Sequence, residues 1–355
     1  MRHAWAQASG LACSADDRPS PAAAVAGAGG IQAQDRRAAR LSVWTRARHL
    51  DASAIEQALV GDRSVVRTWA MRGTLHLVPA ADVRWLLALL GPVFVAATAR
   101  RYRELGLDEA ACATAVAVIG RAVAAEGPLT RSALAERIRA GGVDVETGGR
   151  AAAHLVRRAA LEGAICCGPD DDGGETYVAL EDWIGGHGAD GPRGEAAVAE
   201  LARRHLAAFG PARVEDFATW SGLAMTRARA AWRLLDGKLA QVLAAGRRAW
   251  MLVGTALEVG ATRSPCVRLL PAFDTYLLGH KGRELIVDDR FAARVWPGGG
   301  WIHPTVVVAG RVVATWRVGP SGEIEVEPFT PLSDEEGMGV DVEAGRLRTF
   351  LGGAS

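Results

Sequence analysis

The sequence predicts an α+β protein in which three similar helical units, each ending in a β-hairpin, precede a β-rich C-terminal segment. Three observations favour this fold. Helical apolar periodicity is followed three times by paired β-like runs. A Gly-Pro pair recurs at Gly127-Pro128 and at Gly210-Pro211, ahead of a short helical pattern. From Val267 onward, short apolar runs alternate with Gly, Asp and Pro. Helices followed by a hairpin is the order of a winged helix, so we expect three tandem winged-helix motifs.

The first unit is expected at residues 1–106. Its predicted elements are helices at 22–27, 38–49 and 53–60, hairpin strands at 65–71 and 74–78, and a longer helical connector made by 82–89 and 92–105. Arg72-Gly73 is the predicted turn between the two strands.

The second unit is expected at residues 107–186. Its predicted elements are helices at 129–138 and 150–162 and hairpin strands at 164–167 and 176–180. Thr130 is the predicted N-cap of the first of these helices. The hairpin turn at 169–174 is acidic, and an acidic tip would repel phosphate. This favours a scaffold role for the second unit over contact with DNA.

The third unit is expected at residues 187–265. Its predicted elements are helices at 196–208, 214–220 and 226–235, and hairpin strands at 239–243 and 248–253. The helix at 226–235 is the candidate recognition helix, and the hairpin tip is basic. The last segment, 266–355, predicts a small barrel or sheet closed by a helix. Its predicted elements are strands at 268–270, 286–287, 305–308, 311–318 and 324–327, and a helix from 333 to about 350.

The composition of the chain excludes few classes of function. The chain has 355 residues, is 49% hydrophobic and carries a formal net charge of +1, so charge alone does not indicate nucleic-acid binding. Lys238 and Lys281 are the only lysines; all other cationic residues are arginines, whose planar fork suits phosphate. A GC-rich coding sequence would raise Arg, Ala, Gly and Val together and explains the same bias.

The five cysteines show no zinc-binding spacing, which predicts reduced thiols in a cytoplasmic protein. We see no signal peptide, and the apolar stretch at 86–97 is too short to span a bilayer. No metal cluster, phosphate loop or dinucleotide motif is visible, so we expect no metal and no cofactor. We also expect no membrane association and no obligate protein partner.

The most informative segment is Gln32-Ala33-Gln34-Asp35, which directly follows Gly29-Gly30. Residues two apart point to the same side of an extended chain but to nearly opposite sides of a helix. If the segment is extended, two primary amides converge and together hold one water molecule. Asp35 would then cap the following helix. The alternative is that both glutamines are ordinary surface residues.

The segment Gly30 to Asp35, with Ala38-Ala39-Arg40-Leu41 after it, resembles the catalytic segment of the AlkZ/YcaQ family of bacterial DNA glycosylases. Segments starting at Trp69, Leu270 and Pro304 also resemble that family, in the same order along the chain. The Gln-x-Gln form is similar to the AlkZ branch, whereas the other branch carries Gln-x-Asp. The resemblance implies three winged-helix motifs in a C-shaped body, followed by a C-terminal β-barrel-like domain.

The resemblance implies base excision repair: hydrolysis of the N-glycosidic bond of N7-alkylguanine in double-stranded DNA, with Gln32 and Gln34 as the catalytic pair. A cationic base leaves readily, so two neutral amides need only position the water. Neutral lesions are then expected to be poor substrates. The resemblance also implies that lesions are read without a deep flipping pocket, which would give access to bulky adducts or interstrand crosslinks from alkylating natural products. Housekeeping repair and antibiotic self-resistance are both compatible with the sequence.

Six further residues are candidate DNA contacts: His76, Arg36, Arg40, His280, Lys281 and Arg283. A structural histidine is the alternative for His76, and a solvated loop is the alternative for the cluster at 280–283. Asp274 and Tyr276, in the second family-like segment, are expected to make structural hydrogen bonds. Neither lysine lies in a motif for Schiff-base chemistry, which predicts a monofunctional glycosylase.

Two other functions remain open. Tandem winged helices and near-neutral charge also suit a non-catalytic DNA-binding or scaffold protein. A protein that sequesters a DNA-alkylating natural product would bind the small molecule without turnover. The Gln32 and Gln34 pair favours the enzyme over both.

Overall fold

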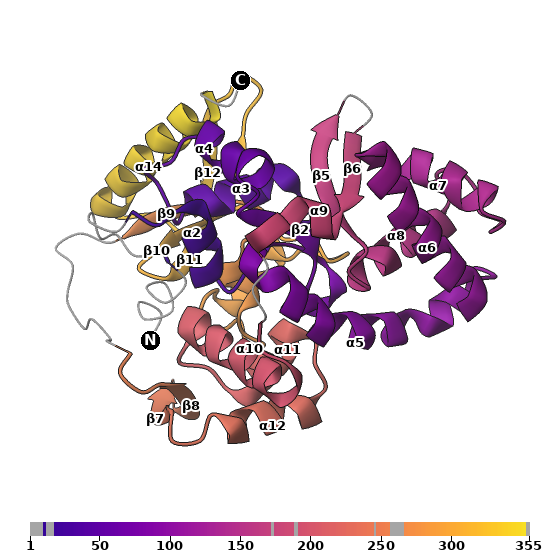
Figure 1. The fold of residues 1–355 in the computed structure, drawn as a ribbon. Coiled ribbons are helices and arrows are strands. Elements are labelled where there is room, and N and C mark those ends of the chain that lie inside the picture. The colour runs from indigo at the N-terminus through magenta and orange to yellow at the C-terminus, as the bar shows by residue number, and fades with distance from the viewer. Residues whose placement is uncertain are drawn as a thin grey trace. The chain divides into compact units, whose positions relative to one another are not determined.

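The computed structural model describes residues 10–11, 18–171, 174–187, 191–244, 246–255 and 266–352. The chain divides into two compact units. One combines Met1–Glu56 with Ala199–Ser355, and the other is Gln57–Val198 (Figure 1). The first predicted segment, 1–106, is therefore split near residue 56, because its helices and its hairpin belong to different units. The boundaries predicted at 106, 186 and 265 stay predictions.

In the unit Gln57–Val198, strands β2 (Val65–Trp69) and β3 (Leu75–Pro79) form the predicted antiparallel hairpin. Its turn contains Arg72 and Gly73, both with positive φ angles. Helix α5 (Val83–Glu104) runs through Pro92 without a break, so the two predicted stretches form one long helical connector.

Packing explains why α5 continues through the proline. A Cβ added at Gly91 would overlap the carbonyl oxygen of Leu161, so α5 lies directly on helix α8 (Arg150–Leu161). Proline inside a helix costs about 3 kcal/mol, and burial of the apolar side chains on either side offsets that cost. By length and composition, Ala80–Glu104 would suffice for a membrane span, but 56% of its most apolar window is buried inside the protein, as in a core helix.

The rest of this unit has the element order predicted for the second unit. Helix α7 (Arg131–Ala140) begins at Thr130, whose hydroxyl accepts from the Ala133 N–H at 3.3 Å, which confirms the predicted cap. Strands β5 (Ile165–Asp171) and β6 (Gly174–Ala179) form the acidic hairpin, and the short strand β4 (Leu129–Thr130) pairs with β6. Helix α6 (Glu109–Glu126) was not predicted; it is rich in alanine and packs into the core of the unit.

The other unit contains a second segment of the same order. Its elements are α10 (Gly194–Phe209), which begins just before the unit boundary, α11 (Val214–Ser221), α12 (Met225–Leu234), β7 (Leu239–Ala244) and β8 (Arg247–Leu252). Ala212 pairs with Trp250 of β8 through hydrogen bonds of 2.9 and 2.8 Å. Both hairpins thus pair their second strand with a short β segment that follows a Gly-Pro pair.

The C-terminal part forms a four-stranded antiparallel sheet in the order β12-β11-β10-β9, followed by helix α14 (Asp334–Gly352). The strands are β9 (Val267–Leu270), β10 (Thr305–Val308), β11 (Arg311–Val318) and β12 (Ile324–Pro328). Within the described ranges this sheet is open, with β9 and β12 at its edges, so the pairings do not show the predicted barrel closure. Ile286 and Val287 are buried in a turn rather than in a strand, because their side chains fill the core beneath the sheet.

The cysteines differ in part from the prediction of reduced thiols. Cys112, Cys166 and Cys167 are free and buried, as expected for structural thiols. Cys266 is disulfide-bonded, so the prediction was wrong for this residue.

Candidate active site

The glutamine segment begins where helix α2 (Pro21–Gly27) is forced to end. The Gly30 N–H donates to the Val25 carbonyl at 2.9 Å and the Gly29 N–H to the Ala26 carbonyl at 3.0 Å, the hydrogen-bond pattern of a Schellman motif. Gly29 has a φ of 69° and Gly30 a φ of 89°, which favour glycine at both positions. A Cβ at Gly29 would also lie 3.3 Å from ring atoms of Phe209 and Trp220. The pair Gly29-Gly30 therefore fixes the point at which the chain becomes extended.

Gln32 and Gln34 lie on the same side of the extended chain. Strand β1 spans Ile31–Gln32, and the burial of side chains alternates from there. Ile31 and Ala33 are fully buried, whereas Gln32 is half-buried and Gln34 is exposed. This alternation is the period of an extended segment, and it turns both amides toward the solvent side. The alternation agrees with the expected extended segment, while the convergence of the two amides and their catalytic role stay predictions.

Asp35 is the N-cap of helix α3 (Arg36–Trp44). One carboxylate oxygen accepts from the Ala38 N–H at 2.8 Å, and the backbone of Asp35 is extended. A cap of this kind stabilises a helix by about 1 kcal/mol and is favoured by a negative charge at the N-terminus. The predicted capping role is confirmed. Because this oxygen already accepts a backbone hydrogen bond, capping is favoured over general-base chemistry.

The far end of the α3 region is anchored by a buried ion pair. Arg46 donates to both carboxylate oxygens of Asp274, at 2.8 and 2.9 Å, and the Ser42 hydroxyl donates to the same carboxylate at 2.6 Å. Burial alone would raise the pKa of Asp274, but Arg46, the Ser42 hydroxyl and the Tyr276 N–H together hold that pKa below its ordinary value. The Tyr276 hydroxyl donates to the Gly310 carbonyl at 2.7 Å. The structural hydrogen-bonding roles predicted for Asp274 and Tyr276 are confirmed.

A second contact ties the same region to the last helix. Arg48 pairs with Glu343 of α14 at 2.6 Å, and Glu343 is 4% exposed. The rings of Trp44 and Phe350 stack with their centroids 5.0 Å apart. The glutamine segment is therefore held between a glycine turn on one side and a helix fastened to the C-terminal part on the other.

Arg36 and Arg40, the candidate DNA contacts beside the glutamines, are both half-buried. Arg40 donates to Glu56 through two nitrogens, at 2.7 and 2.9 Å, so a carboxylate already offsets its charge. Arg37, which lies between them in sequence, is exposed. Contact of Arg36 or Arg40 with DNA stays a prediction, and Arg37 is the more accessible cation.

The structure places His76 in the interior rather than at the surface. It is 1% exposed, and its Nδ1 lies 2.9 Å from the Thr74 carbonyl oxygen. Burial, with a smaller contribution from Arg72, lowers the pKa of His76 to about 3. A neutral, buried imidazole is poorly suited to contact a phosphate. The alternative of a structural histidine is therefore favoured, and the predicted DNA contact stays untested.

The cluster at residues 280–283 is only partly at the surface. His280 is 8% exposed, its Nε2 lies 2.8 Å from the Phe209 carbonyl oxygen, and burial lowers its pKa. Lys281 and Arg283 are exposed, and the Arg283 guanidinium lies 4.2 Å from the centroid of the Trp296 ring. Only Lys281 and Arg283 thus remain available to a phosphate, because His280 is used in packing.

Sequence reasoning missed the partners that hold this site. Ser42, Glu56 and Glu343 carry no motif, and Arg46 lies 228 positions from Asp274. The one available signal was the family-like segment that contains Asp274. Charged partners separated by that distance leave no pattern in a single sequence.

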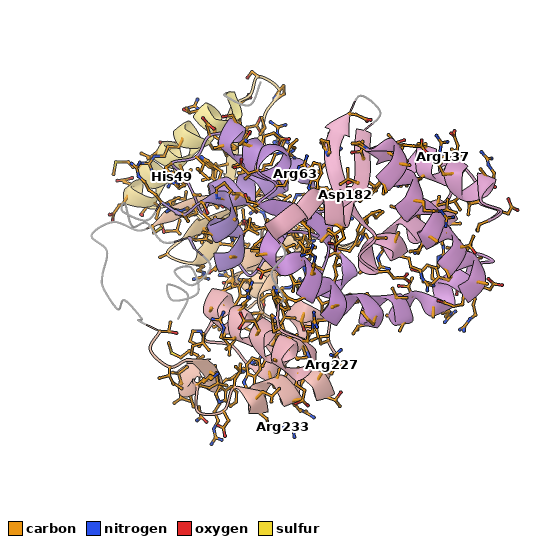
Figure 2. The ribbon with its side chains drawn as sticks, viewed as in Figure 1. His49, Arg63, Arg137, Asp182, Arg227 and Arg233 are labelled. Carbon is orange, nitrogen blue, oxygen red and sulfur yellow. The ribbon has the colours of Figure 1, made fainter. Side chains whose placement is uncertain are left out.

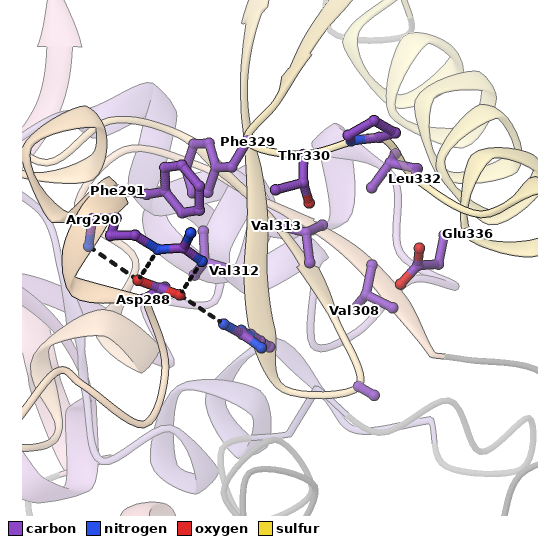
Figure 3. A pocket seen from close by; sticks show the side chains of 13 residues that line it. Asp288, Arg290, Phe291, Val308, Val312, Val313, Phe329, Thr330, Leu332 and Glu336 are labelled. Atoms are coloured by element: carbon purple, nitrogen blue, oxygen red, sulfur yellow. Dashed lines mark hydrogen bonds and ion pairs between the residues drawn. The ribbon is translucent and has the colours of Figure 1, made fainter.

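A pocket of about 690 Å³ lies apart from this site, beside strands β10 and β11 (Figure 3). The stacked rings of Phe291 and Phe329 form part of its wall. Asp288 pairs with Arg290 at 2.8 Å and with Arg311 at 3.4 Å. The charged groups around Asp288 already satisfy one another, so the pocket offers no specific reason to sequester an ionic small molecule.

Comparison with known proteins identifies the family of this chain. The family described as DNA glycosylase AlkZ-like matches residues 25–350. An interstrand DNA cross-link repair glycosylase of Streptomyces sahachiroi is 30% identical over 356 residues, spanning 94% of this chain and 92% of that protein. The solved structure of the S. sahachiroi DNA glycosylase AlkZ matches with a TM-score of 0.83 and 27% identity, over 98% of this chain and 96% of that chain. The predicted family and the mixed α+β fold are confirmed. The chain therefore belongs to the AlkZ-like family of DNA glycosylases.

Proposed function

We propose that this protein is a monofunctional DNA glycosylase that hydrolyses the N-glycosidic bond of cationic N7-alkylguanine in duplex DNA. The observation that carries the proposal is the placement of Gln32 and Gln34 on one accessible side of an extended segment held at both ends. Membership in a glycosylase family supplies the reaction class and makes DNA the expected substrate.

Two amides suit this reaction because the leaving group is already charged. The water oxygen forms a bond to C1′ as the bond from C1′ to N9 breaks. The electron pair of that bond neutralises the alkylated base, and the water loses a proton to solvent. A primary amide is too weak a base to take that proton near pH 7, but it can accept from the water and hold it in line. Neutral lesions lack the charged leaving group and are proposed to be poor substrates.

The accessibility of the site supports bulky substrates. Gln34 is exposed rather than enclosed in a cavity, so a large group on the base does not have to enter a closed pocket. A relative is named as an interstrand cross-link repair enzyme. We extend the proposal to bulky adducts and interstrand crosslinks from alkylating natural products.

The proposal also includes a winged-helix architecture and a cytoplasmic location. The two segments that end in β5–β6 and β7–β8 would be winged-helix motifs, and the order from α2 to β3 supports a third. The enzyme would act in the cytoplasm without a cofactor. Strand cleavage is not expected, because Lys238 and Lys281 lie outside the glutamine segment. Borohydride trapping of a protein–DNA adduct would count against a monofunctional enzyme.

The decisive experiment measures release of N7-methylguanine from an alkylated duplex under single-turnover conditions. We expect Gln34→Ala to lower the excision rate more than about tenfold with folding unchanged, because the water loses one of its two holders. The double variant Gln32→Ala/Gln34→Ala should have a still lower excision rate. Asp35→Asn is the matched control, since asparagine also caps helices and should keep most of the rate.

Two outcomes would redirect the proposal. Near-normal excision by Gln34→Ala would contradict the proposed catalytic role of Gln32 and Gln34. No release by wild type would leave a bulky-adduct specialist or a non-catalytic scaffold, and an interstrand crosslink would be the next substrate. Binding of an alkylating small molecule without turnover would favour the sequestering protein.

A further inference from the structure

Helix α12 and the β7–β8 hairpin carry a group of exposed cationic side chains that the proposed chemistry does not use. Its members are Arg229, Arg233, Lys238, Arg247 and Arg248. We call this group the α12–hairpin surface. Figure 2 labels Arg227 and Arg233 on α12, in the part of the molecule that contains this surface. Asp236 is the one acidic residue between Met225 and Leu252.

The burial pattern of α12 explains why its arginines face solvent. Ala228 and Ala231 are fully buried, and the Trp232 ring packs against Phe217 of α11 with centroids 5.7 Å apart. Arg229 and Arg233 are one helical turn apart and lie on the opposite side. The small residues of α12 thus pack against the protein, and its guanidinium groups are exposed to solvent.

These cations are largely uncompensated. Across the described ranges, no acidic side chain lies within ion-pair distance of Arg229, Arg233, Lys238 or Arg248. Arg247 approaches Glu284 at 3.6 Å, but both side chains are well exposed, so this pair contributes little. Some exposed arginines elsewhere in the chain do pair with carboxylates, as Arg100 does with Glu104 at 2.9 Å.

The hairpin adds an apolar element to the same surface. Leu243 lies opposite Arg248 across the two strands, and Leu243 is 76% exposed. On the other face of the hairpin Ala249 and Met251 are buried, which fixes the direction in which Leu243 and Arg248 point. Val253, just beyond β8, is 63% exposed. Exposed apolar groups beside unpaired cations are typical of a surface that meets a partner.

We propose that the α12–hairpin surface binds the phosphate backbone of duplex DNA without reading its sequence, and contributes to binding rather than to bond cleavage. Phosphate contacts position a protein on DNA and account for most non-specific affinity. Guanidinium groups spaced along a helix and a hairpin match a row of phosphates, and Leu243 would lie against the sugars between them. Binding to undamaged duplex does not depend on the proposed glycosylase activity; only an effect on excision does.

The test is the salt dependence of binding to an undamaged duplex, measured by fluorescence anisotropy between 50 and 200 mM NaCl, concentrations chosen to span a range over which phosphate contacts change affinity by orders of magnitude. The variant combines Arg229→Gln, Arg233→Gln, Lys238→Gln and Arg248→Gln. Each lost phosphate contact lowers the slope of log K against log salt by about 0.9, so we expect a decrease approaching about 3.6. The affinity at low salt should fall by at least about tenfold.

The matched control removes the same charge from the other unit. Arg103, Arg121, Arg139 and Arg150 are exposed there, and each is changed to Gln. We expect the control to keep the wild-type slope. Equal loss of slope in both variants would mean that affinity follows net charge and would overturn the assignment. Urea denaturation of both variants checks that folding is unchanged.

Measuring the excision rate distinguishes the glycosylase proposal from the proposal that the α12–hairpin surface binds DNA. With saturating enzyme, the four-substitution variant should release N7-methylguanine at the wild-type rate, with a higher enzyme concentration at half-maximal rate. Normal duplex binding with lost excision would overturn the inference, and so would loss of binding to a polyglutamate peptide with duplex binding retained, which would indicate an acidic protein partner. If wild type excises nothing but the variant still loses duplex binding, the glycosylase proposal fails and the surface assignment stands.

Discussion

The β5–β6 and β7–β8 hairpins occupy the same position in two segments of the same order, but their side chains face opposite environments. Each hairpin follows two helices and pairs its second strand with a short β segment after a Gly-Pro pair. In β5–β6, Glu175 accepts from Arg67 and from the Tyr177 hydroxyl. In β7–β8, Leu243 and Arg248 lie exposed across from each other.

The two hairpins have the same position in the order of elements, so this position does not determine their roles. The partners of their side chains differ, and we infer the roles from those partners. The first residues of β5 are buried and Glu175 of this hairpin pairs with Arg67 within the unit, which is typical of a structural part. Within the described residues Arg248 of the β7–β8 hairpin has no acidic partner, and Arg247 has only the exposed carboxylate of Glu284 at 3.6 Å, so we assign this hairpin to binding. Four measurements would break or sharpen this comparison.

The largest expected effect is on stability in the acidic hairpin. Glu175→Ala leaves the guanidinium of Arg67, whose side chain is 12% exposed, without its carboxylate. We expect the free energy of unfolding to fall by about 2 kcal/mol, measured by urea denaturation. Glu327→Ala removes a carboxylate that is 79% exposed and pairs with Arg294, so it should cost less than about 0.5 kcal/mol. Equal losses of unfolding free energy in the two variants would mean that the buried and the exposed ion pair contribute alike.

The pH dependence of stability should separate buried from exposed cationic groups. His76 of the β2–β3 hairpin is neutral when folded, because burial lowers its pKa to about 3, whereas the unfolded chain takes up this proton below about pH 6.5. The unfolded state then binds more protons, so stability falls as pH is lowered. From pH 7 to pH 5 the decrease should be about 2 kcal/mol for this one histidine.

His205, whose pKa burial also lowers to about 3, adds a decrease of the same sign. His76→Gln should therefore remove part of the pH effect and leave part, as measured by urea denaturation at both pH values. Guanidinium groups in general stay charged at both pH values, so duplex affinity of the folded protein should change little. An unchanged pH effect in His76→Gln would mean that His76 is protonated in the folded state.

Removing charge from the acidic hairpin should have a small effect on DNA binding. Asp170→Asn with Asp171→Asn eliminates two exposed carboxylates near its tip. If this hairpin is a scaffold, the dissociation constant for undamaged duplex should change by less than about twofold, because screening weakens charges that lie beyond about 10 Å from the phosphates. A tenfold gain in affinity, measured by anisotropy, would instead place this hairpin at the DNA.

A modest effect on duplex binding is expected from the apolar side chain on the basic hairpin. Leu243→Ala should weaken duplex binding by a few-fold without changing the salt slope, since the lost contact involves sugars and not phosphates. Met338→Ala is the control, because Met338 is 63% exposed on α14, far from the hairpin in sequence. A changed salt slope in Leu243→Ala would mean that the leucine acts by positioning Arg248.

Local patterns predicted most elements and the geometry of the glutamine segment. The Thr130 and Asp35 caps depend on residues three positions away, and the burial alternation around Gln32 and Gln34 depends on two-residue spacing. Such short-range relations are visible in a sequence. The Gln-x-Gln assignment rests on the family resemblance, and its catalytic role stays a prediction.

What could not be predicted depends on contacts between distant segments. Helix α5 continues through Pro92 because Gly91 lies on α8, and His76 and His280 are buried by residues that are remote in sequence. Helix α6 escaped notice because its many alanines give no clear apolar face. The pairing of Arg46 with Asp274 has no local signature. Prediction failed where long-range packing determines the outcome.

The pairing of Arg46 with Asp274 also has a consequence for the order of biosynthesis. Chains are made from the N-terminus, so the glutamine segment is synthesised 228 positions or more before the carboxylate that anchors the Arg46 end of its helix region. Glu343, on the last helix, arrives later still. Until then Arg46 and Arg48 remain solvated and α3 lacks its far anchor. A nascent chain that has not reached Glu343 therefore carries the motif without the fixed geometry, and the candidate active site matures only after that residue has been made.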